Sequence, residues 1–150
     1  MRDDFGISLF DMCKSERERA VLQDPDLGDE LRILLIRLGV MPSLRGYDYL
    51  MYAIKLCVAN REYIRNVTTK LYPVVAAKFG AEPAVVERNI RHCIAVIVTR
   101  GRLHYLNEYL GASVFSESDR PTNAEFISLV ADKVSADIVD RRVRAYRDVR

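Results

Sequence analysis

The sequence predicts an all-α fold built as one globular domain of 150 residues. Apolar residues recur every three to four positions from about residue 27 to about residue 134, which is the spacing of helices that bury one face. The sequence contains no alternating strand pattern of useful length, no internal repeat and no low-complexity segment. With 49% hydrophobic and 29% charged residues, the composition allows a sizeable core and excludes collagen-like, proline-rich and wholly disordered chains.

The leucine-rich stretch near residue 30 is the first strongly predicted helix. Asp29 and Glu30 lie at the positive end of the helix dipole, and Gly39 is the expected stop. A second helix is expected after Pro42, ending near Asn60. Their apolar stripes are Leu31, Leu34, Leu35 and Leu38, and Leu50, Ala53, Ile54 and Cys57. A weaker pattern around Leu9, Cys13 and Ala20 indicates one more helix within residues 1–26.

A third apolar stripe is interrupted by Pro73, whose missing N–H predicts a kink there. The stripe consists of Val67, Leu71, Val75 and Phe79. After a turn at 80–82, Pro83 suits the first position of a long central helix that ends at Gly101. Its buried face is expected to contain Val86, Ile90, Cys93, Ile94 and Ile97.

Two more helices complete the prediction. Leu103, Leu106 and Leu110 give a short helix closed by Gly111, and a loop follows over 112–120. Thr122 and Glu125 form a capping box at the start of the last helix. The buried face of that helix is expected to contain Phe126, Ile127, Val130 and Val134.

Charge is distributed unevenly along the chain. Residues 1–30 contain nine acidic and four basic residues, whereas residues 31–102 contain twelve basic and four acidic residues, which favours a polyanionic partner. We therefore divide the chain into an acidic segment (1–28), a helical body (29–137) and an Arg-rich tail (138–150), which is either a mobile arm or a solvated surface. The acidic segment is also able to fold over the basic body and compete with the polyanion.

The chain is expected to be cytoplasmic. Its longest apolar run, residues 93–98, is far shorter than the roughly 20 residues of a membrane span, and no secretory signal precedes the acidic segment. Cys13, Cys57 and Cys93 form no C-x-x-C pair, which argues against a disulfide framework or a zinc site. We expect them to be reduced and mostly buried.

The helices around residues 80–82 suggest helix-turn-helix geometry, in which the first helix crosses the DNA backbone and the second enters the major groove. Ala76 is small enough for close approach, Gly80 suits a left-handed turn, and Phe79 and Val86 are expected to fill the angle between the helices. The apolar anchor at Ile90 indicates a turn one residue longer than the tightest version. An ordinary helical hairpin remains the alternative interpretation.

The second of these helices has a polar face that points away from the core. At about 100° per residue, Arg88 and Arg91 point outward between the small Ala84 and Ala95. Arg88 is able to donate to guanine O6 and N7. Glu87 is able to accept from a cytosine amino group, or to form a surface ion pair with Arg91. The candidate DNA-binding residues are Ala84, Val85, Glu87, Arg88, Arg91, His92, Lys70 and Lys78.

Enzymatic signatures are missing from the sequence. His92 and Cys93 are neighbours that point about 100° apart on a helix, so they cannot act together on one substrate, and His104 is isolated. The sequence has no nucleophile elbow, P-loop, H-E-x-x-H motif or dinucleotide fingerprint. We predict no catalysis, no cofactor and no metal site.

Several motifs, in order, resemble the C-terminal effector domain of the stage-zero sporulation protein A family. They are GYDYL at 46–50, LYP at 71–73, VER at 86–88, IRH at 90–92, Arg100-Gly101 and PTNAEFISLVADK at 121–133. The resemblance covers roughly residues 30–136. It implies a compact bundle of about six helices containing a helix-turn-helix, which binds a short TGTCGAA-like promoter box and touches RNA polymerase sigma subunits.

The resemblance also implies roles for particular residues. Glu87 and Arg88 match base-reading positions, and Arg91 and His92 match positions farther along the same helix. Val85 departs from the family, which usually has an arginine there that reads a guanine, so the preferred box is expected to differ. The family's preceding serine is Ala84 here, and the polar residue before the helix is Glu82.

The family's regulators carry an N-terminal receiver domain of at least about 100 residues, and only about 30 residues precede the resemblance here. We therefore expect a stand-alone effector, a fragment or a divergent paralogue. The first functional hypothesis is a sequence-specific transcription regulator that forms a homodimer on DNA. The alternative is a module that binds the sigma subunit or the full-length sporulation regulator.

Overall fold

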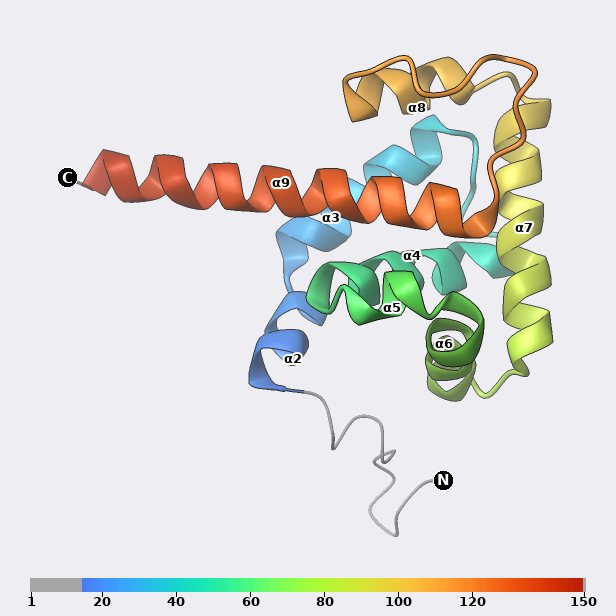
Figure 1. Cartoon of the computed structure of the whole chain (residues 1–150), viewed down its shortest axis with the longest axis horizontal. Helices are drawn as coiled ribbons and strands as arrows, with labels where there is room; N and C mark the ends of the chain where they lie inside the picture. The colour runs from blue at the N-terminus through green and yellow to red at the C-terminus, as the bar shows by residue number, and fades with distance from the viewer. Residues whose placement is uncertain (1–14, 150) are drawn as a thin grey trace, which may run out of the picture.

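The computed structural model describes residues 15–149, all of whose regular elements are helical (Figure 1). The predicted all-α class is confirmed. Eight α-helices and one π-helical turn occur in this part of the chain. The short α5 is the helix that the sequence did not predict. They are α2 (Glu16–Leu22), α3 (Pro25–Arg37), α4 (Arg45–Ala59), α5 (Glu62–Arg65), η1 (Val67–Leu71), α6 (Tyr72–Phe79), α7 (Pro83–Thr99), α8 (Leu103–Leu110) and α9 (Asn123–Val149).

Helix α4 lies at the centre of the bundle and packs against α2, α3, α5, α6, α7 and α9. It is buried on most sides because small and aliphatic residues follow one another around it. The apolar faces predicted for the other long helices also meet in this core. The largest fully buried side chains are Leu27, Leu31, Leu35, Leu38, Leu50, Ile54, Leu56, Leu71, Ile90, Ile97, Leu106 and Phe126.

Helix α3 begins earlier than the leucine spacing predicts. The Asp24 carboxylate accepts a hydrogen bond from the Asp26 N–H at 2.9 Å, and Pro25 occupies the first turn. Asp29 and Glu30 therefore lie within the helix and not at its start. An aspartate followed by proline is a standard helix start. The predicted stripe of leucines begins only at Leu31, so the apolar spacing alone places the start of the helix too late.

The interruption predicted at Pro73 takes the form of a π-helical turn. The Leu71 N–H donates to the Asn66 carbonyl at 3.0 Å, five residues back, and α-helical geometry begins at Tyr72. A wider turn before the proline accommodates a ring that would otherwise clash with the preceding turn.

The predicted boundaries at residues 28 and 138 both fall inside helices, α3 and α9. The Thr122–Glu125 capping box is present: the Thr122 N–H donates to the Glu125 carboxylate and the Glu125 N–H donates to the Thr122 hydroxyl. From this cap, α9 runs without a break to Val149, so the Arg-rich tail is helical up to that residue.

Helix α2 packs on α4, and the Asn60 amide donates to the Glu18 carboxylate at 3.2 Å. It covers part of the weak helical pattern of residues 1–26; Leu9 and Cys13 lie outside the described residues. In Figure 1, α2 and α7 lie at opposite ends of the body, so this part of the acidic segment does not cover α7.

Candidate nucleic-acid interface

The α6–α7 unit is joined by a tight turn at Gly80. Gly80 has φ +63°, a left-handed conformation that glycine adopts without steric cost. The next N–H, that of Ala81, donates to the Ala76 carbonyl at 2.9 Å and closes the end of α6. Pro83 then opens α7, as the sequence predicted.

The inner face of α7 is fixed in the core. All five apolar residues predicted for this face are buried. Gly46 of α4 lies directly against α7: a Cβ atom placed there would be 2.8 Å from the Asn89 carbonyl carbon and 2.5 Å from the Cys93 sulfur. The two helices therefore cross with their backbones in contact, which only glycine permits.

The outer face of α7 is exposed where the sequence predicted it. Arg88, Arg91 and His92 are exposed, as are the flanking residues Ala84 and Ala95. Figure 1 places α7 along one edge of the body. This face combines two guanidinium groups with small residues that let a partner approach the helix backbone.

Val85 and Glu87, at the margins of the outer face, are half-buried. Glu87 accepts a hydrogen bond from the Arg91 guanidinium at 2.8 Å, so the ion pair given as one interpretation of these residues is formed. The Asn89 amide donates to the Val85 carbonyl at 2.8 Å and stays on its own helix. Arg88 is therefore the outward arginine best placed to contact a partner without breaking an ion pair that the structure records.

An asparagine that is not among the predicted site residues connects the α6–α7 unit to α9. The buried Asn123 amide donates to the Tyr72 hydroxyl at 3.0 Å and to the Glu87 carbonyl at 3.1 Å. Burial raises the pKa of Tyr72, and the Asn123 hydrogen bond acts in the opposite direction. The burial of Asn123 could have been predicted from the sequence, because Asn123 precedes Phe126 and Ile127 by three and four residues, the spacing of one helix face.

The two predicted lysines lie on the π-helical turn and on α6. Both Lys70 and Lys78 are exposed, and the Lys78 ammonium group lies 5.7 Å from the centre of the Tyr52 ring. Phe79 does not fill the angle between α6 and α7 as expected. It is 40% exposed, and its ring makes edge contacts with Tyr49 and Tyr52 of α4, which attract it away from α7.

The two cysteines within the described residues are buried free thiols. Burial raises the pKa of Cys57 to about 12 and that of Cys93 to about 11, so both remain protonated near neutral pH. Among residues 15–149, no group of three or more histidine, cysteine or acidic side chains is arranged to hold a metal ion. Within the same residues, no helix combines the length and apolarity needed to cross a bilayer.

The fold and this surface define an all-helical domain that exposes a basic face of one long helix. Residues 31–134 match the family described as sporulation initiation factor Spo0A C terminal. The match covers more than two thirds of the sequence, and the chain belongs to this family. The family consists of sporulation-related DNA-binding effector domains and is not a family of enzymes.

Proposed function

We propose that this protein is a cytoplasmic, sequence-specific transcription regulator in which α6 and α7 act as a helix-turn-helix. The outer face of α7 carries the proposal, because it offers exposed arginines between two small residues while the opposite face is fixed in the core. The family membership of residues 31–134 supports the same function. The proposed partner is double-stranded promoter DNA, bound by two copies of the chain.

In this proposal, Arg88 reads a guanine by donating to its O6 and N7 atoms. Arg91 and His92 lie one turn farther along the helix and contact either bases or phosphates. Lys70 and Lys78 are proposed phosphate contacts, because the first helix of such a motif crosses the DNA backbone. Ala84 and Val85 provide close apolar contact near the start of α7, where a thymine methyl group is the suitable target.

The test compares Arg88→Ala with the parent on its best DNA site, selected from random sequences. We expect a loss of about 1–3 kcal/mol in binding free energy and a relaxed preference at one guanine. Arg32→Ala is the matched control, because Arg32 is an exposed α3 arginine paired with Asp29 at 3.0 Å. An equal loss on every sequence would reduce Arg88 to a phosphate contact.

Val85 provides a second test of base reading. Val85→Arg supplies the guanidinium that the resemblance leads us to expect, so binding to a TGTCGAA-like duplex should tighten more than binding to a scrambled duplex. Equal gains on both duplexes would show that the added charge acts through phosphates alone.

The alternative is a protein-interaction module that binds a sigma subunit or the full-length regulator. Val85 and the pairing of Arg91 with Glu87 favour it, because both reduce the polar groups available to bases. A salt titration separates the two functions, since phosphate contacts give a steep negative slope of log affinity against log salt concentration. A flat slope with promoter DNA, together with capture of the purified sigma subunit, would support the module.

A further inference from the structure

Helix α9 is longer than its packing in the core requires. The family match ends at residue 134, whereas α9 continues to Val149, and in Figure 1 its C-terminal half runs out beyond the body. Its inner face still follows the core for part of this length. Val134 is buried, Ile138 packs against the core, and Arg141 pairs with Glu30 of α3 at 3.5 Å.

A second apolar stripe lies on the opposite side of the same helix. Val143 is nine residues from Val134, which places the two on opposite faces at about 100° per residue. The stripe residues follow one another at alternating spacings of three and four, the spacing of a coiled-coil seam. The stripe consists of Ala136, Val139, Val143 and Tyr146. The side chains of Val139, Val143 and Tyr146 are 60%, 43% and 64% exposed.

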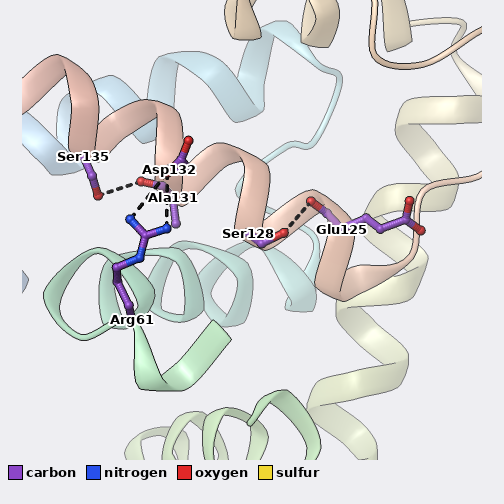
Figure 2. Close-up of polar contacts among 6 residues, drawn as sticks. All are labelled: Arg61, Glu125, Ser128, Ala131, Asp132 and Ser135. Atoms are coloured by element: carbon purple, nitrogen blue, oxygen red, sulfur yellow. Dashed lines mark hydrogen bonds and ion pairs between the residues drawn. The ribbon is translucent and has the colours of Figure 1, made fainter. Parts of the chain in front are cut away.

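The end of the stripe nearest the body is closed by a polar contact. Figure 2 shows the Arg61 guanidinium reaching from the start of α5 to Asp132 of α9, with its two nitrogens 3.4 Å and 3.5 Å from one carboxylate oxygen. In the same view Ser135 turns back to the Ala131 carbonyl. The apolar surface therefore begins beyond this contact and follows the projecting half of the helix.

We propose that this stripe, residues 136–149 of α9, is a self-association surface that packs antiparallel against the same stripe of a second copy. The inference goes beyond DNA binding and does not depend on it. A second copy fits because the stripe is self-complementary across a twofold axis, as an isologous interface requires.

The charges beside the stripe favour the antiparallel direction. Asp140 and Arg147 lie seven residues apart on one flank, and Arg142 lies on the other flank. In an antiparallel pair, equivalent flanks face each other, so Asp140 of each copy meets Arg147 of the other. In a parallel pair, opposite flanks meet, and Arg142 would face Arg147. Asp140 also pairs with Arg144 of its own helix at 3.2 Å, and a carboxylate is able to accept from both arginines.

The size of the surface predicts a weak, concentration-dependent dimer. About two heptads from each copy contribute, which places the contact among interfaces that bury less than about 1,200 Å². Sedimentation velocity of the full chain without DNA, from about 5 to about 500 μM, should show a mass that rises from 17.2 kDa toward twice that value. A single 17.2 kDa species over the whole range would overturn the proposal.

Two variants of matched exposure locate the surface. Val143→Glu should weaken association at least about tenfold, because it places a charge at the centre of the seam. Val114→Glu should leave association unchanged, since Val114 is 44% exposed in the loop after α8. Equal association of the two variants would exclude the α9 stripe. Dimerisation that appears only after removal of residues 1–14 would show that the chain covers its own stripe, which also overturns the proposal.

A charge exchange tests the direction. Arg147→Asp should weaken the antiparallel dimer, because it places like charges opposite Asp140, and adding Asp140→Arg should restore association. A parallel pair would respond in the opposite sense, since Arg147→Asp would then face Arg142 and strengthen association. Association that strengthens with Arg147→Asp alone would therefore refute the antiparallel arrangement. Because none of these measurements uses DNA, their failure leaves the proposed regulatory function untouched.

Discussion

Replacing Gly46 with alanine tests whether the crossing of α4 and α7 sets the position of α7. The added Cβ atom would meet the Asn89 carbonyl group and the Cys93 sulfur at less than ordinary contact distance. The main obstacle is backbone, which cannot rotate away, so the helices must move apart. We expect overpacking to cost about 3 kcal/mol, offset by about 1 kcal/mol of improved helix propensity.

The net loss of about 2 kcal/mol should be visible in urea denaturation followed by circular dichroism. With a slope of about 2 kcal/mol per molar for a domain of this size, the midpoint should fall by about 1 M. Gly28→Ala is the matched control within α3, because a Cβ there would meet only the Lys55 ammonium group at 3.6 Å. We expect this control to be neutral or to gain up to about 1 kcal/mol. A Gly46→Ala protein as stable as the control would refute the close crossing.

Three further predictions concern the Asn123 hydrogen bonds, the buried thiols and the acidic segment. In urea denaturation, Asn123→Ala should lower the free energy of unfolding by about 1–3 kcal/mol, because it leaves the buried Tyr72 hydroxyl and the Glu87 carbonyl without their shared donor. Tyr72→Phe should lower it by less, because the Asn123 amide still donates to the Glu87 carbonyl. Equal losses would contradict the role of Asn123 as the shared donor. Stability should decline between about pH 8 and about pH 10.5, because the fold holds the protons of the buried Cys57 and Cys93 thiols more tightly than the unfolded chain, and the buried tyrosines act in the same direction. A denaturation midpoint that stays constant over this range would contradict the raised pKa values. If residues 1–14 mask the basic face, their removal with α2 kept in place should strengthen DNA binding at low salt. Identical salt dependence of binding with and without these residues would exclude masking.

The helix stripes could be predicted because local spacing alone decides which residues face the core. Every apolar residue assigned to the inner face of α7 is buried, and the outward residues Arg88 and Arg91 are exposed. Phe79 could not be placed in the same way. Its spacing is that of a core residue, but contacts with the neighbouring tyrosines of α4 hold it at the surface. The spacing of apolar residues within one helix does not predict such contacts between helices.

The extension of α9 shows a different limit of the sequence. The Arg-rich composition of residues 138–150 predicts a solvated or mobile tail. The apolar stripe on this part of α9 contains only a few residues, so the composition gives no sign of it. The two faces of α9 lie on opposite sides, so their residues together do not give one clear stripe.

Two contacts far apart in the sequence, Gly46 against Asn89 and Asn123 against the Glu87 carbonyl, hold the first half of α7. Both act on its backbone, and neither uses a side chain of the outer face. A helix that reads bases has to place its arginines with a precision that its own hydrogen bonds cannot supply, because the whole helix is able to shift as a rigid body. If α7 reads DNA as proposed, variants of Gly46 and Asn123 should therefore reduce discrimination between DNA sequences, although neither residue belongs to the outer face. Loss of Arg88 removes one contact, whereas displacement of the helix misplaces several, so Gly46→Ala should relax preference at more than one base pair where Arg88→Ala relaxes it at one.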